Sequence, residues 1–276
     1  MFPTGVQIYS VRDHAERDFF STLEKLKNMG YDGVEFAGLY GYKPKEVKEY
    51  CEKLNLVPVS AHVSIDDMLV CPDEVFAAYQ IIGCEYIAIP YLTEDRRPGG
   101  ANYENTFIQI ASLGEKAKLH GLTLLYHNHD FEFCKTGSDN KYFLDVLYET
   151  VSPAFLQTEL DTCWVNVGGE NPAEYLIKYT GRSPVVHIKD FVKKSKDSKS
   201  GLYELIGITP AERQAEEDDF AFRPLGYGVQ DIPSIIAAAK TAGSKWLIVE
   251  QDRTCLGLDS LECMKLSAQY LKKVNI

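Results

Sequence analysis

Short apolar runs rich in β-branched residues alternate along this chain with longer stretches in which apolar residues recur at helical spacing. Apolar runs of this kind, bounded by Gly, Pro or Asn, predict β-strands that are buried on both faces. Eight strands are predicted in this way, over Val6–Ser10, Gly33–Ala37, Val57–Val63, Tyr86–Tyr91, Thr123–His129, Gln157–Asp161, Val185–Lys189 and Trp246–Gln251.

A recurring unit connects each helical stretch to the strand that follows it: a helix tail, a glycine and then the strand. It appears as KLKNMGYDGVEF, YQIIGCEYIAI, KAKLHGLTLLYH and AKTAGSKWLIVE. A glycine at this point accepts the left-handed conformation that often ends a helix. Repeated strand–helix units predict parallel βαβ connections, and eight of them predict a closed (β/α)8 TIM barrel. A doubly wound open sheet is the alternative, but no GxGxxG follows the first strand.

The pattern predicts a single TIM-barrel domain over residues 1–276, with one irregular excursion at about 191–223. This excursion mixes KKSKDSKSG with AERQAEEDDF and is much longer than a usual connection. It reads as a surface segment with a short helix, which acts either as a lid or as a tolerated insertion.

Composition excludes several classes of protein. The net charge of −11 argues against nucleic acid and anionic membranes as partners. The seven cysteines include no CxxC pair, so we expect reduced thiols and no structural zinc. No apolar run approaches the ~20 residues of a membrane span. The N-terminus lacks the apolar core of a signal peptide, so a cytoplasmic location is expected, although a leader could have been trimmed before the first strand.

Titratable side chains gather at the predicted strand ends, where TIM barrels carry their active sites. Four of the six histidines lie there, namely His62, His127, His129 and His187. A strand-end histidine taken alone is more often structural, and an aspartate there often caps the next helix. Carboxylates and imidazoles that converge on one mouth, however, repel one another unless a divalent cation is bound. Oxygen and nitrogen donors without thiolate suit Mn, Mg, Co, Fe or Zn.

The motifs YHNHDFEF, ELDTCWV, VVHIKD, PLGYGVQDI and WLIVEQD, taken together, resemble the sugar phosphate isomerase/epimerase superfamily of xylose isomerase-like TIM barrels. The resemblance covers essentially the whole chain and implies one divalent metal held by Glu, Asp, His and Glu from strands five to eight. Asp161, His187 and Glu250 match three of these ligands. The position of the first glutamate falls on His127, and Glu132 follows in the loop, so we expect Glu132 as the fourth ligand with His127 as the alternative.

The resemblance also implies proton abstraction beside a carbonyl through an enediolate. Glu250 is the candidate base, with Glu132 also assigned to the catalytic set, and Lys189 is the candidate cation for the developing oxyanion unless it faces away and pairs with a carboxylate. The candidate substrate-binding residues are His62, His127, His129, Trp164, Glu35 and Tyr9. His127 or His129 could instead orient a metal ligand.

These assignments predict a metal-dependent isomerase or epimerase that acts on a small carbohydrate: a sugar, a keto-sugar or a keto-glycoside. The alternatives are a cyclitol (inosose) dehydratase, a keto-glycoside hydrolase or lyase, and a non-catalytic sugar-binding barrel. No strong phosphate clamp is present, which favours an unphosphorylated substrate. A homo-oligomer is compatible with such a barrel.

Overall fold

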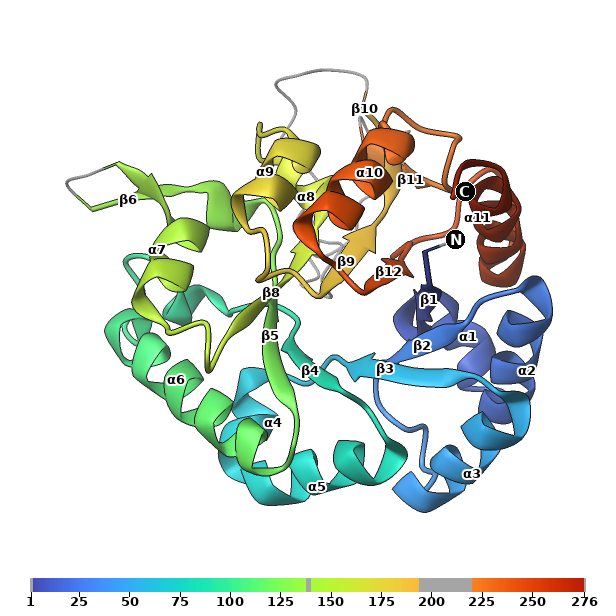
Figure 1. Ribbon diagram of the computed structural model, residues 1–276, viewed down its shortest axis with the longest axis horizontal. Coiled ribbons are helices and arrows are strands. Elements are labelled where there is room, and N and C mark those ends of the chain that lie inside the picture. The colour runs from blue at the N-terminus through green and yellow to red at the C-terminus, as the bar shows by residue number, and fades with distance from the viewer. Residues whose placement is uncertain (1, 138–139, 194–219, 276) are drawn as a thin grey trace, which may run out of the picture.

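The computed structural model describes residues 2–137, 140–193 and 220–275. Eight parallel strands form one sheet in the order β3-β2-β1-β12-β9-β8-β5-β4 (Figure 1). The strands are β1 (Thr4–Gln7), β2 (Gly33–Phe36), β3 (Val57–Ala61), β4 (Tyr86–Ile89), β5 (Thr123–His127), β8 (Gln157–Asp161), β9 (Val185–Ile188) and β12 (Trp246–Val249). The two edge strands meet through a parallel bridge between His62 and Ala88. The backbone N–H of Val63 also donates to the carbonyl of Ala88 at 3.0 Å. The predicted (β/α)8 barrel is therefore confirmed.

Helices lie around the outside of this barrel (Figure 1). They are α1 (Arg12–Ala15), α2 (Phe19–Met29), α3 (Pro44–Leu54), α4 (Ile65–Val70), α5 (Pro72–Ile82), α6 (Tyr103–Leu119), α7 (Phe143–Thr150), α8 (Thr162–Val167), α9 (Pro172–Lys178), α10 (Ile232–Ala242) and α11 (Ser260–Val274). The predicted glycine stops are present: α2 ends at Gly30, with φ of 105°, and α10 ends at Gly243, with φ of 80°. Each glycine lets the chain reverse directly into the next barrel strand.

Seven of the eight predicted strands end one to three residues earlier than expected, β8 ends at Asp161 as predicted, and two small hairpins were not predicted. Strand β1 ends at Gln7 rather than Ser10, because the Gln7 side chain accepts from the Tyr9 N–H and starts a 3-10 turn over Ile8–Val11. The β3 strand ends at Ala61, two residues before the predicted end. Outside the barrel, β6 (Lys135–Thr136) pairs with β7 (Lys141–Tyr142), and β10 (Asp190–Lys193) pairs with β11 (Phe220–Arg223).

The β10–β11 pair joins the two ends of the irregular excursion expected at 191–223. Residues 194–219 of that excursion lie outside the described residues, so its reading as a lid or an insertion stays a prediction. None of the described helices is long and apolar enough to cross a membrane.

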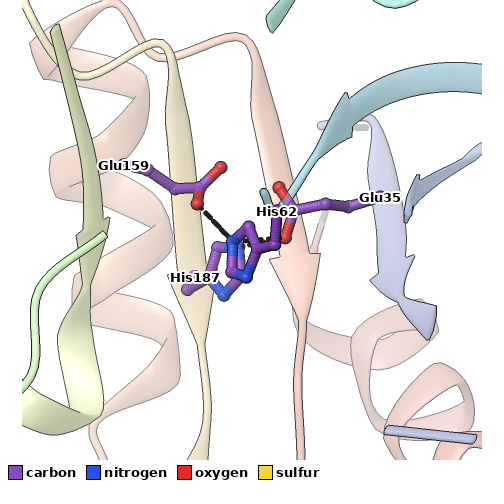
Figure 2. Close-up of side chains that lie close together, drawn as sticks. All are labelled: Glu35, His62, Glu159 and His187. Carbon is purple, nitrogen blue, oxygen red and sulfur yellow. Dashed lines mark hydrogen bonds and ion pairs between the residues drawn. The ribbon is translucent and has the colours of Figure 1, made fainter. Parts of the chain in front are cut away.

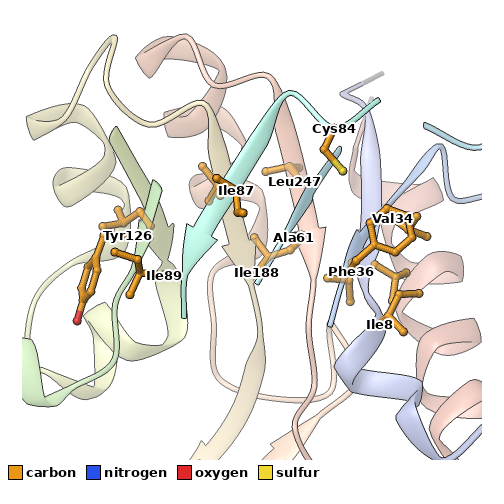
Figure 3. Packing of buried hydrophobic residues seen from close by; sticks show 14 of the residues in the cluster. Ile8, Val34, Phe36, Ala61, Cys84, Ile87, Ile89, Tyr126, Ile188 and Leu247 are labelled. Carbon is orange, nitrogen blue, oxygen red and sulfur yellow. The ribbon is translucent and has the colours of Figure 1, made fainter. Parts of the chain in front are cut away.

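Side chains on the two faces of the barrel strands form separate apolar clusters. The outer cluster, between strands and helices, includes Ile87, Ile188 and Leu247, and Figure 3 shows part of it. A smaller cluster fills the other face and contains Leu125, Val185 and Ile248, each one residue away from a member of the outer set. Since side chains alternate along a strand, this smaller cluster is the barrel interior.

Candidate functional site

Polar side chains replace apolar ones toward the carboxyl ends of the inward-facing rows. On β9, Val185 belongs to the apolar interior, and His187 is the next residue on the same face. On β12, Ile248 belongs to that interior, and Glu250 follows on the same face just past the strand. The apolar layer thus forms a floor, and the barrel mouth above it is lined by titratable groups.

Four of these groups bring one donor atom each to a common point. The donors come from β5, β8, β9 and the end of β12 and lie within 4.8 Å of one another; the residues are His127, Asp161, His187 and Glu250. Metal bonds of about 2.0–2.2 Å place neighbouring ligand atoms roughly 3 Å apart. His127 Nε2 lies 3.2 Å from Asp161 Oδ2, and His187 Nδ1 lies 2.8 Å from Glu250 Oε2. Two imidazoles and two carboxylates at these spacings fit a divalent transition-metal ion.

Both partners at the His127–Asp161 edge are oriented for such a role. His127 Nδ1 lies 3.1 Å from the carbonyl oxygen of Pro90, so this nitrogen carries the proton and Nε2 presents its lone pair. Burial lowers the pKa of His127 to about 4, which keeps the imidazole neutral. Asp161 accepts the Trp164 backbone N–H at 3.0 Å through Oδ1, as the cap of α8, and leaves Oδ2 facing His127.

The structure does not bring Glu132, the expected fourth ligand, into this group of donors. Its carboxylate accepts hydrogen bonds from the Tyr126 hydroxyl and, at 2.8 Å, from the His129 backbone N–H. Tyr126 belongs to the outer cluster between strands and helices, whereas Leu125 and His127 flank it on the interior face of β5. The loop therefore returns Glu132 to the outer side of β5, and His127, the alternative, lies where the fourth donor was expected. Burial raises the pKa of Glu132 to about 8.

Lys189 lies among three carboxylates at the mouth, so it pairs with carboxylates without facing away from the site. Its Nζ is 3.0 Å from Glu250 Oε2, 3.2 Å from Asp161 Oδ2 and 3.2 Å from Asp252 Oδ2. Although burial opposes its charge, these carboxylates hold the pKa of Lys189 well above its ordinary value. Burial raises the pKa of Asp252 to about 7, with Lys189 acting in the opposite direction.

A second group of donors lies deeper in the barrel, on the interior side of β2, β8 and β9 and at the residue that follows β3. It consists of Glu35, His62, Glu159 and His187, again within 4.8 Å of one another (Figure 2). His62 Nε2 lies 2.6 Å from Glu159 Oε2 and 3.0 Å from Glu35 Oε1. Burial opposes the charged imidazole, but these two glutamates raise the pKa of His62 to about 10. His187 takes part in both groups through its two ring nitrogens.

A cavity of about 240 Å³ opens above the donors. Its lining combines apolar, aromatic and titratable side chains: Tyr9, Ala37, His62, Pro90, Tyr91, His127, His129, Lys189, Glu250 and Asp252. Five of the expected substrate or catalytic residues thus share one cavity with Glu250, namely Tyr9, His62, His127, His129 and Lys189. Glu35 and Trp164 do not line it.

Trp164 instead supports a cavity residue. Its ring is 1% exposed and packs 5.4 Å from the ring of His129 and 6.0 Å from that of Phe220. On another side, His129 stacks parallel to Phe131, with ring centroids 5.3 Å apart. Arg97 lies over the Phe131 ring at 3.4 Å. His129 is therefore held by aromatic packing, and its Nδ1 has no hydrogen-bond partner among the described residues.

Sequence reasoning gave no role to Glu159, Tyr91 or Asp252, although all three stand at predicted strand ends. Glu159 precedes Asp161 by two residues and Asp252 follows Glu250 by two, so the two-residue strand period was a usable signal for both. The Pro90 carbonyl and Arg97 leave no such signal, because their roles depend on how the β4 loop folds.

Comparison with known proteins agrees with the barrel fold. The family described as xylose isomerase-like TIM barrel matches residues 23–274. An inosose dehydratase of Lacticaseibacillus casei is 22% identical over 285 aligned residues, which cover 93% of this chain and 89% of that protein. Among solved structures, a sugar phosphate isomerase/epimerase of Parabacteroides distasonis superposes with a TM-score of 0.75 at 20% identity, covering 99% of this chain and 98% of the other.

A second solved structure, of the IOLI protein with a zinc atom, has a TM-score of 0.71 at 15% identity and covers 99% of this chain and 98% of that protein. At these identities the superpositions show the shared fold. The match of the family over most of the sequence, together with the eight-stranded barrel, shows that this chain belongs to the xylose isomerase-like TIM barrel family.

Proposed function

We propose that this protein is a divalent-metal-dependent enzyme that removes a proton from a carbon next to the carbonyl group of a small uncharged carbohydrate. One observation carries the proposal: Glu250 belongs to the group of four metal donors and also lines the cavity. A carbonyl compound bound against that group would therefore present its neighbouring carbon to a carboxylate.

His127, Asp161, His187 and Glu250 would hold the metal, which supplies Lewis-acid polarisation of the carbonyl oxygen. Burial opposes the ionised form of Glu250, yet Lys189 and His187 hold its pKa well below the ordinary value. Glu250 is therefore ionised at neutral pH and has a lone pair with which to accept the proton. Lys189 would offset the negative charge that develops on the substrate oxygen.

The cavity chemistry supports an uncharged substrate. Among the described residues that line the cavity, Lys189 alone is a lysine or arginine, and its ammonium group already contacts three carboxylates. A phosphate or carboxylate on the substrate would meet the negative charge of Glu250 and Asp252. His129 and Tyr91 offer polar atoms beside aromatic faces, which suit hydroxyl groups and the apolar face of a sugar or cyclitol ring.

Isomerisation or epimerisation follows when the proton returns to another carbon or to the other face. Dehydration follows when a hydroxyl leaves the neighbouring carbon. Dehydration of an inosose is the second candidate, since a relative aligned over 93% of this chain is an inosose dehydratase. Both reactions begin with the same proton abstraction by Glu250.

The shared step is tested by incubating the Mn-loaded protein with ketoses, inososes and 3-keto-glycosides in D2O and following products by NMR. We expect deuterium at a carbon next to a carbonyl, and none with Glu250→Gln assayed at saturating Mn. Turnover of any substrate without deuterium incorporation would rule out the proposed step. The product separates the two candidates: an isomer or epimer in one case, loss of water in the other. A sugar-binding barrel would instead hold less than about a tenth of an equivalent of metal and gain no activity with Mn.

A further inference from the structure

The inner group of donors has the composition of a metal site. We propose that Glu35, His62, Glu159 and His187 form a second divalent-cation site beneath the first, with the His187 imidazole bridging the two. The donors come from three strands and from His62, the residue after β3, and they meet inside the barrel; Figure 2 shows Glu35 and Glu159 on either side of the two imidazoles. Two nitrogens and two carboxylate oxygens suit Zn²⁺ or Mn²⁺.

Two atoms of this inner group are left without hydrogen bonds. They are Oε1 of Glu159 and Nε2 of His187, both on fully buried side chains, and neither has a partner among the described residues. His187 Nε2 lies 2.8 Å from Glu35 Oε1 and 3.6 Å from Glu159 Oε2. This short contact places Nε2 of His187 and the Glu35 carboxylate at the spacing of two ligands of one cation. Buried polar atoms of native proteins are nearly always satisfied, and a cation between these donors would coordinate Nε2 of His187 together with Oε2 of Glu159.

Charge balance points the same way. The buried carboxylates around the two groups are Glu35, Glu159, Asp161, Glu250 and Asp252, and the ammonium of Lys189 is the buried lysine that contacts three of them. The first group of donors (His127, Asp161, His187 and Glu250) is called the outer group. One divalent cation bound there leaves an excess of negative charge, which is expensive to bury. A cation on Nδ1 of His187 also prevents that ring from becoming an imidazolium. The charge of the inner carboxylates is then balanced by a proton on His62, by a proton on Glu159, whose pKa burial raises to about 8, or by a cation of their own.

A cation can reach the inner group through the cavity, because the His62 side chain lines the cavity and is 11% exposed. When both sites are filled, His187 binds one cation through each nitrogen and releases its N–H proton to solvent. Protonated His62 likewise gives up its proton before it binds.

Metal analysis of the purified chain after dialysis against excess Zn²⁺ or Mn²⁺ tests this proposal. We expect the wild type to bind two equivalents of metal. His62→Ala and Glu35→Gln should each bind one equivalent, in the outer group, and Asp161→Asn should bind one equivalent, in the inner group. His120→Ala is the matched control, since His120 pairs with exposed Asp73 outside both groups, and it should keep two equivalents. A wild type with one equivalent that His62→Ala retains would overturn the inner site and leave the proposed function standing. No bound metal in the wild type would overturn both.

An anomalous difference map from wild-type crystals soaked in Zn²⁺ or Mn²⁺ needs no variant and therefore remains decisive if substitutions in the barrel interior prevent folding. Two peaks, one on each side of the His187 ring, are expected. A single peak on the Nδ1 side would overturn the proposal and identify the inner group as a network of hydrogen-bonded side chains.

Discussion

Nζ of Lys189 lies 3.0 Å from Oε2 of Glu250, an oxygen that also lies 2.8 Å from Nδ1 of His187. The lysine thus contacts an atom that belongs to the outer group of metal donors. Its contact with Asp161 Oδ2, at 3.2 Å, involves a second atom of that group. A positive side chain so placed holds the donors together when no divalent cation is bound, and competes with the cation when one is.

Replacing this ammonium by an apolar side chain of similar length, in Lys189→Met, should strengthen metal binding. We expect the Kd for Mn²⁺ to fall about tenfold, equivalent to about 1.4 kcal/mol, because competition and repulsion are both removed. Turnover should fall by about 10²-fold or more, since the developing oxyanion loses its cation. Titration calorimetry and steady-state kinetics measure the two effects.

The metal-free form of Lys189→Met should also be less stable by about 3–5 kcal/mol, because three buried carboxylates lose their partner. Lys245→Met is the control: Lys245 pairs with Glu85 on the exposed surface, where an ion pair contributes little. A higher Kd for Mn²⁺ in Lys189→Met would contradict the competition argument.

The choice between His127 and Glu132 as the fourth ligand can be measured directly. We expect His127→Ala to lower metal affinity by about 100-fold or more, because it removes a donor atom, whereas Glu132→Gln should change it less than tenfold. Asp161→Ala and His187→Ala should each lose the outer metal. Competition with a chromophoric chelator gives the affinities. Loss of metal in Glu132→Gln with retention in His127→Ala would restore the assignment made from sequence.

The barrel and most of the site could be predicted from the sequence because both follow from periodicity. Strand–helix repeats with glycine stops indicate the fold, and the strand ends of a parallel barrel meet at one mouth. Asp161, His187 and Glu250 stand at those ends, and the structure brings them to one point. For Lys189 the sequence left two alternatives, a cation for the oxyanion or a side chain that faces away and pairs with a carboxylate. The structure places it at the mouth with His187, beside the Asp161 carboxylate.

The position of the Glu132 side chain could not be predicted, because this residue lies in a loop after β5, where the two-residue period of a strand no longer determines which way a side chain points. A return of the loop to the interior face of β5 would place its carboxylate beside Asp161. The Tyr126 hydroxyl and the His129 N–H stabilise a return to the outer face instead. Trp164 illustrates a similar limit, since its distance from the cavity depends on Phe220 and Phe222, which follow much later in the chain.

His129 should contribute to substrate binding more than to metal binding. Its Nδ1 has no hydrogen-bond partner within the part of the chain that the structure describes, and its ring lines the cavity, so a substrate hydroxyl can form that hydrogen bond. Burial holds the pKa of His129 well below its ordinary value, and the ring is therefore neutral. His129→Ala should lower kcat/KM by about 10²-fold, chiefly through KM if the contact is equally strong in the ground and transition states. Metal content should be unchanged.

Phe131→Leu serves as the graded comparison, because it keeps His129 but removes the parallel ring against which the imidazole stacks. We expect a loss of kcat/KM smaller than that of His129→Ala, with the same pattern in KM. Unchanged kinetics in His129→Ala would show that the imidazole makes no contact with the substrate.

Stability should depend on pH through Glu132. Burial raises its pKa in the folded protein to about 8, above the ordinary carboxyl value of 4.5. Between these values the folded chain holds a proton that the unfolded chain releases, so folding is favoured less as the pH rises. The contribution of protonated Glu132 is complete below the unfolded pKa and is lost as the pH increases through the folded pKa. Each unit of pKa difference corresponds to about 1.4 kcal/mol.

Glu132→Gln separates this dependence from that of other buried carboxyls such as Glu159 and Asp252. In the wild type the Tyr126 hydroxyl and the His129 N–H both donate to Glu132. The amide oxygen can still accept from the His129 N–H and the amide NH2 can donate to the Tyr126 oxygen, but the amide does not titrate. Urea unfolding of both metal-free proteins between about pH 5 and about pH 8 should show the wild type losing at least about 1.4 kcal/mol relative to the variant. A constant difference across this range would mean that Glu132 is ionised in the folded protein, and that its carboxylate is stabilised by a cation or a hydrogen-bond donor near it.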